Sequence, residues 1–124
     1  MTGKICEYAK KKYGSEREFL WSGSNNSVVR RNDNKKWYAV FITVPKFRLG
    51  LEGNEPINIV DIKCDPIIAG SLRTKHGYLP AYHMNKSKWI TVLLDGSIPL
   101  DEILPLIDMS YNLAASAKTK RTSE

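Results

Sequence analysis

The sequence predicts an α+β domain in which an antiparallel β-sheet is covered by helices on one side. Residues 28–44 carry a hairpin pattern, because two runs rich in β-branched and aromatic side chains flank an Asn-Asp-Asn-Lys turn. Residues 5–13 and the segment after Pro99 repeat apolar side chains at helical spacing. With 124 residues, 42% of them hydrophobic, the chain is long enough to bury a continuous core as one domain.

Four strands are predicted from such runs. The second of them is the strongest pattern in the chain, and Pro45 closes it before a long loop at 46–55. The third sets Ile57, Ile59 and Asp61 against Asn58, Val60 and Ile62, which implies burial on much of both faces. Residues 78–88 read as an extended linker rich in aromatic and hydrogen-bonding groups. The predicted strands are residues 28–31, 36–44, 57–63 and 89–95.

Three helices are predicted. The first ends at Gly14, and the second begins with Asp65 as cap and Pro66 in the first helical position and ends before Gly77. The last begins near Pro99 and carries an apolar stripe at i, i+3, i+4 spacing, and residues 118–124 are expected to fray. The predicted helices are residues 5–13, 65–75 and 99–117.

The charge of the chain favours anionic partners. The formal net charge is +6 and the pI is about 9.4. Residues 1–37 hold nine basic and four acidic side chains, so most of the excess lies in the first third. Basic side chains alternate with aromatic ones on the predicted strands, a pattern that can pair with phosphates and stack on bases. The candidate nucleic-acid-binding residues are Arg30, Arg31, Lys35, Lys36, Lys63, Lys86 and Lys88. The alternative is an ordinary solvated surface, with Trp37, Tyr38 and Trp89 in the core.

No catalytic, cofactor or metal signature is recognisable in the sequence. His83 is the first residue to test for catalysis, but nothing near it completes a triad, and a structural histidine that fastens its loop to the sheet is favoured. The two histidines and the two distant cysteines lack ligand spacing, which argues against a zinc site. The sequence has no signal-peptide pattern and no stretch long enough to span a membrane, so the cytoplasm is the expected compartment. The sequence leaves the oligomeric state open, and a monomer is favoured.

Three segments carry a family resemblance. Residues 80–89 read Pro-Ala-Tyr-His-Met-Asn-Lys-Ser-Lys-Trp and are followed by Leu-Asp-Gly at 94–96. Residues 63–66 read Lys-Cys-Asp-Pro, and Leu-Ile-Asp-Met-Ser-Tyr begins at 106. Together they resemble the MmcQ/YjbR family over about residues 36–114, with Lys88 where many members have histidine.

The resemblance implies a CyaY-like or double-wing fold, and the fold likeness implies DNA binding by analogy. Its polar motif residues are expected on a loop, where binding residues gather. The motif residues carried over to that loop and its end are Tyr82, His83, Asn85, Lys86 and Trp89.

Two functional hypotheses follow. The first is a non-enzymatic DNA-binding protein that contacts the phosphate backbone through its basic residues. The alternative is a small-ligand or protein-interaction domain that uses the loop from Tyr82 to Lys86. An enzyme that uses His83 is a third and weaker hypothesis.

Overall fold

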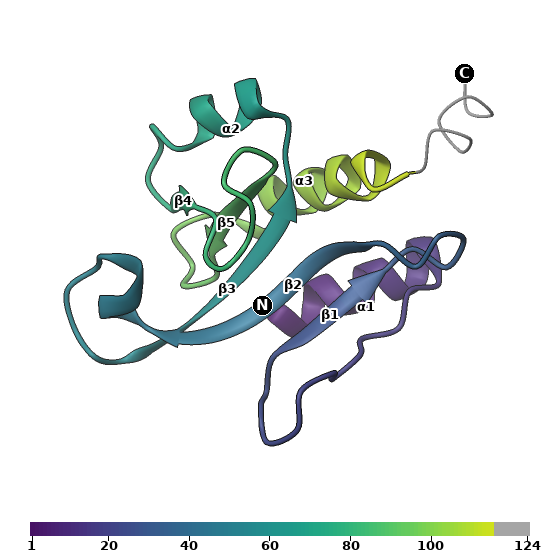
Figure 1. Cartoon of the computed structure of the whole chain (residues 1–124), viewed down its shortest axis with the longest axis horizontal. Helices are drawn as coiled ribbons and strands as arrows, with labels where there is room; N and C mark the ends of the chain where they lie inside the picture. Colours follow the sequence, from purple (N-terminus) through teal and green to yellow (C-terminus); the bar gives the residue numbers. More distant parts are fainter. Residues whose placement is uncertain (116–124) are drawn as a thin grey trace.

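The computed structural model describes residues 1–115, so the expectation for residues 118–124 lies outside the described part of the chain. Three α-helices and a five-stranded antiparallel sheet make up the fold (Figure 1). The predicted α+β class and the three helices are confirmed, and the sheet has one strand more than the four predicted. A 3-10 helix, η1, follows the second strand. The elements are α1 (Thr2–Tyr13), β1 (Ser27–Arg30), β2 (Trp37–Pro45), η1 (Lys46–Leu49), β3 (Pro56–Lys63), α2 (Pro66–Leu72), β4 (Tyr78–Pro80), β5 (Trp89–Leu93) and α3 (Leu100–Leu113).

The sheet has the strand order β1-β2-β3-β5-β4, with every pair antiparallel and β3 in the centre. Side chains of a strand alternate between the two faces, and residues paired across strands share a face. Val40 pairs with Asp61, and Asp61 pairs with Thr91, so these three side chains lie on the same face. The predicted burial of both faces of β3 is confirmed, since Ile57, Ile59 and Asp61 are buried on one face and Val60 and Ile62 on the other.

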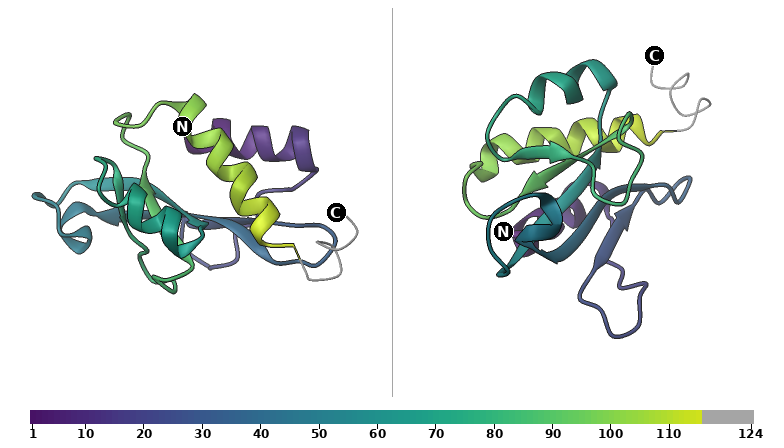
Figure 2. Two further views of the ribbon diagram at one scale, coloured as in Figure 1. Left: turned by 90° about the horizontal axis from the view of Figure 1, so that it is seen from above. Right: turned by 60° about the vertical axis from the view of Figure 1, so that its left-hand side comes forward.

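Helices α1 and α3 cover one face of the sheet (Figure 2). Ile5 of α1 and Ile103 and Ile107 of α3 are fully buried against Val60 and Val92 of the sheet. The apolar stripes predicted for both helices therefore point to the core. We call this the helix-covered face and the opposite one the open face.

A buried serine of α3 ties the helix to two strands. Ser110 is fully buried, and its hydroxyl donates a hydrogen bond to the Tyr38 carbonyl of β2. The same hydroxyl accepts a hydrogen bond of 2.8 Å from the backbone N–H of Lys63, at the end of β3. Ser110 thus satisfies one orphan backbone group on each strand.

Several predicted boundaries are wrong. Helix α1 begins at Thr2 rather than at residue 5, and α3 ends at Leu113 rather than at residue 117. Helix α2 ends at Leu72 rather than near Lys75. Gly77 does not end the helix but lies in a later turn, with a φ of +96°. The predicted linker 78–88 begins with β4, which pairs with β5 and forms one edge of the sheet. The predicted loop 46–55 begins with η1. Within residues 1–115, no helix has both the length and the apolar character needed to cross a membrane.

Candidate binding cleft

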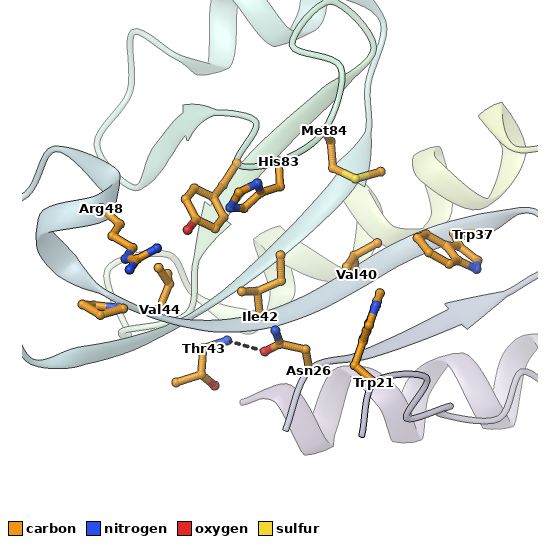
Figure 3. A pocket seen from close by; sticks show the side chains of 12 residues that line it. Trp21, Asn26, Trp37, Val40, Ile42, Thr43, Val44, Arg48, His83 and Met84 are labelled. Carbon is orange, nitrogen blue, oxygen red and sulfur yellow. Dashed lines mark hydrogen bonds between the residues drawn. The ribbon is translucent and has the colours of Figure 1, made fainter. Parts of the chain in front are cut away.

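A cleft of about 500 Å³ lies on the open face of the sheet (Figure 3). Its floor is formed by Val40, Ile42 and Val44, alternate residues of β2 that point to the same side. The segment before β1, η1 and the 81–88 loop between β4 and β5 supply its walls. This volume is in the range of small-molecule sites. The lining residues are Trp21, Asn26, Trp37, Val40, Ile42, Thr43, Val44, Pro45, Arg48, Tyr82, His83 and Met84.

A β-bulge brings Trp37 into the cleft. The β1–β2 register shifts between Val29, which pairs with Ala39, and Arg30, which pairs with Trp37. Tyr38 is therefore an extra residue, and both Tyr38 and Ala39 pack in the helix-covered core. The bulge returns Trp37 to the face of Val40, although the two residues are an odd number of positions apart. Without the bulge, strict alternation would point Trp37 toward the helices.

Two tryptophans form one end of the cleft. The Trp21 ring meets the Trp37 ring edge to face, with 5.9 Å between centroids and an interplanar angle of 76°. Trp21 remains 41% exposed, although it comes from a segment with no regular structure. Beside it, the side-chain oxygen of Asn26 accepts a hydrogen bond of 3.0 Å from the Thr43 N–H, which holds this segment against β2. Exposed indoles at a concave site are typical of ligand and partner surfaces.

The 81–88 loop crosses the open face and supplies the opposite wall (Figure 2). The Tyr82 N–H donates a 2.9 Å hydrogen bond to the Thr91 hydroxyl, and the Asn85 carbonyl accepts from the N–H groups of Lys88 and Trp89. His83 has a φ of +61°, in the left-handed region that side chains rarely adopt. A loop fixed at both ends holds this conformation.

Some motif residues line the cleft and others have structural roles. Tyr82 and His83 line the cleft, and their rings meet edge to face with 4.0 Å between the ring centroids. The Asn85 side chain accepts hydrogen bonds from Ser87 and shapes the loop. Trp89 is buried, and the Lys63 ammonium lies 4.9 Å from its ring centroid. The expectation that His83 fastens the loop is wrong, because its side chain is exposed and the backbone of Tyr82 and Asn85 does so.

A buried carboxyl group lies under the same loop. Asp61 is fully buried on the open face of β3, and its Oδ1 accepts a hydrogen bond from the Thr91 hydroxyl. Within residues 1–115, Oδ2 of Asp61 has no hydrogen-bond partner. Burial raises the pKa of Asp61 to about 7, against the lowering effects of the Thr91 hydroxyl, the Tyr82 N–H and the charge of Lys86.

The two arginines of the predicted DNA-binding set are held by carboxylates. Arg30 makes two hydrogen bonds to Glu18, of 2.7 and 2.5 Å, which lower the pKa of that carboxyl group. Arg31 is buried, makes two hydrogen bonds to Asp33 and a third to the Tyr111 carbonyl, and lowers the pKa of Asp33 to about 2. Arg30 thus uses two and Arg31 three of the five N–H donors of a guanidinium group within the fold.

The lysines of that set are spread over different parts of the molecule. Lys35 and Lys36 are exposed in the β1–β2 turn, whose Asn34 side chain donates to the Ala114 carbonyl at the end of α3. Lys86 and Lys88 are exposed on the 81–88 loop, which lies on the open face. The turn and the loop are thus attached to different sides of the sheet.

Sequence reasoning missed five residues of this region. Asp61 was expected in a buried strand, but its cover by the 81–88 loop depends on tertiary structure. The aromatic Trp21 in a run of turn-forming residues was the one local signal available. The missed residues are Trp21, Asn26, Ile42, Arg48 and Asp61.

The described residues hold no group of three His, Cys, Asp or Glu side chains placed to bind a metal ion. Cys6 and Cys64 are free, and burial raises the pKa of both thiols. The ionisable side chains that line the cleft are those of Arg48, Tyr82 and His83.

The YjbR family model matches residues 10–113 of the chain. The uncharacterised protein YyaQ of Bacillus subtilis is 38% identical over 110 residues, which are 88% of this chain and 93% of YyaQ. The uncharacterised protein YjbR of Escherichia coli K12 is 43% identical over 58 residues, 46% of this chain and 49% of that protein.

Solved structures share the fold. A crystal structure of a Pseudomonas syringae protein superposes with a TM-score of 0.88 at 40% identity, covering 93% of this chain and 99% of that one. The crystal structure of Deinococcus radiodurans DR2400 has a TM-score of 0.70 at 22% identity, covering 98% and 83%. The second likeness extends to the fold alone.

Proposed function

The chain belongs to the YjbR family, and from the cleft on the open face of its sheet we propose that this member is a binding protein for small, ring-containing ligands. The proposal takes up the hypothesis that assigned the contact surface to the loop from Tyr82 to Lys86. It adds the strand floor and the two indoles that lie opposite this loop.

One observation carries the proposal: a concave apolar surface is left exposed between elements that are otherwise well packed. Val40 and Val44 of the floor are buried, but Ile42 between them and Trp37 beside them are only half-buried. Apolar side chains lining a concave surface of this volume gain free energy when a ligand displaces water from them, about 25 cal/mol for each Å² covered. Aromatic walls favour flat rings, which can stack on them or meet their edges.

Filling the cleft should weaken ligand binding without unfolding the protein. Ile42→Trp places an indole on the half-buried floor, and we expect it to weaken binding of the neutral fluorescent probe N-phenyl-1-naphthylamine at least about tenfold, because the two compete for the same apolar surface. The melting temperature should change by less than about 4 °C. Titration of probe fluorescence and a thermal melt measure both quantities.

Ile68→Trp is the matched control. Ile68 lies on α2, away from the cleft, and is 42% exposed, so the same substitution adds an indole elsewhere. Probe affinity should stay unchanged in this variant. Equal weakening in both variants, or in neither, would contradict the placement of the site.

DNA binding remains a prediction with narrower support, because Arg30 and Arg31 are engaged by Glu18 and Asp33. If the exposed lysines bind phosphates, anisotropy of labelled duplex DNA should show affinity that falls at least about tenfold between 50 and 200 mM salt. Lys35→Ala with Lys36→Ala should then reduce both the affinity and the salt slope. No anisotropy change at 50 mM salt would remove the DNA hypothesis.

A further inference from the structure

Among residues 1–115, the ionisable side chains that line the cleft include two nitrogen bases and no carboxyl group. Its lining includes the guanidinium of Arg48 and the imidazole of His83 but, within the described part of the chain, no aspartate or glutamate. An apolar cavity with a cation at its edge and no compensating carboxylate is complementary to an anion. The same two residues also line a second hollow of about 390 Å³, so they lie between the two.

Arg48 differs from the other arginines discussed above. Among the ion pairs of residues 1–115 none involves Arg48, whose guanidinium carbon lies 5.9 Å from the ring centroid of its exposed neighbour Phe47. Its planar donors are therefore available to a ligand. A guanidinium binds carboxylate, sulfonate or phosphate groups with two parallel hydrogen bonds, which is stronger and more directional than a contact to a neutral group.

The arrangement along β2 sets the shape of such a ligand. Figure 3 shows Arg48 at the Val44 end of the cleft and Trp21 and Trp37 at the Val40 end, with Ile42 between. Four residues of a strand span about 13 Å, so one or two fused rings beside the indoles and an acidic group at Arg48 fit the same molecule. His83 lies toward the Arg48 end of the cleft, on the wall formed by the 81–88 loop, which holds its backbone in the left-handed conformation.

We propose that the ligand is a ring-containing organic anion, whose acidic group is bound by Arg48 and His83 and whose rings lie over Ile42 toward Trp21 and Trp37. This inference rests on the proposed function and specifies the chemistry of its ligand. A neutral imidazole adds one N–H donor to those of the guanidinium.

Two probes that differ by one charged group test the inference. 1-Anilinonaphthalene-8-sulfonate has the ring system of N-phenyl-1-naphthylamine with an added sulfonate. Arg48→Gln should weaken sulfonate-probe binding about tenfold and change neutral-probe binding less than about twofold, because only the sulfonate loses a charge-assisted pair. Arg73→Gln, at an exposed position following α2, is the matched control and should change neither affinity.

The outcomes separate the two proposals. If neither probe binds the unmodified protein, or if Ile42→Trp displaces neither, the proposed function is wrong. If both probes bind the cleft but Arg48→Gln weakens both equally or neither, the cleft stands and the anionic ligand class is wrong. Loss of the sulfonate probe alone in Arg48→Gln, with Arg73→Gln unaffected, supports the inference.

Discussion

Replacing Ser110 with alanine should lower the free energy of unfolding by about 3 kcal/mol. The Ser110 hydroxyl is buried between the Tyr38 carbonyl and the Lys63 N–H, and bonds to both. Removing it takes away the hydrogen bond that the Tyr38 carbonyl of β2 and the Lys63 N–H of β3 each make to this buried hydroxyl. Each such loss costs about 1–3 kcal/mol, far more than the small volume lost.

Urea unfolding measures this change, and Ser87→Ala provides the comparison. Ser87 also makes a side-chain hydrogen bond, to Asn85, but on an exposed loop, so its loss should cost less than about 1 kcal/mol. Amide hydrogen exchange of Lys63 should accelerate in Ser110→Ala. A stability close to that of the unmodified protein, with Lys63 exchange unchanged, would show that the bridge is unimportant.

The second large effect concerns the pH dependence of stability. Asp61→Asn should stabilise the protein relative to the unmodified chain by about 2–3 kcal/mol more at pH 8 than at pH 5. Asparagine keeps an oxygen acceptor for the Thr91 hydroxyl but cannot ionise. Any cost of its unpartnered amide group is the same at both pH values and cancels in the difference.

The sign follows from the raised pKa of Asp61, which is about 7 in the folded state, against an ordinary value of 3.8 for an aspartate. Between these values the folded chain holds a proton that the unfolded chain has released, so stability falls as pH rises toward 7 and then levels off. Lys86, the nearby charge that opposes this effect, is on the exposed loop above. Carboxyl groups with a lowered pKa, such as that of Asp33, are common to both proteins and cancel.

Chemical unfolding at pH 5, 6, 7 and 8 gives the two stability curves. They should converge toward acid and diverge by pH 8, and the side-chain carbonyl resonance of Asp61 should titrate near pH 7. Parallel curves would mean that Asp61 is ionised already at pH 5 and that the loop does not desolvate it.

Local patterns in the sequence were sufficient for most of the fold. Three of these patterns depend only on neighbours within a few residues. They are the helical spacing of Ile103 and Ile107, the helix cap at Asp65 and the strand alternation around Asp61. The stop at Gly77 was misread because Leu72 already ends the helix and a turn separates the two. Strand β4 was missed because three residues are too few for a periodic pattern, and its pairing with β5 defines it.

The site depends on contacts that sequence spacing does not reveal. Trp37 reaches the cleft only because a bulge at Tyr38 reverses the alternation of β2. Arg30 was expected to bind phosphates, but it is paired with Glu18, twelve positions away, across the Glu18–Val28 bridge. Arg31 and Asp33 are only two positions apart, so their ion pair is one that the sequence could have suggested. The motif pointed to the loop from Tyr82 to Lys86 as a contact surface, but it revealed neither the concave shape of the surface nor the opposite wall.

The three tryptophans provide the most direct test of a ligand site on the open face. Trp21 and Trp37 line the cleft, whereas Trp89 is buried beneath Lys63. On titration of the ¹⁵N-labelled protein with N-phenyl-1-naphthylamine, we expect the indole N–H resonances of Trp21 and Trp37 to shift together and that of Trp89 to stay in place. Shifts confined to residues of the helix-covered face or of α2, or no shift at saturating probe, would contradict the central claim.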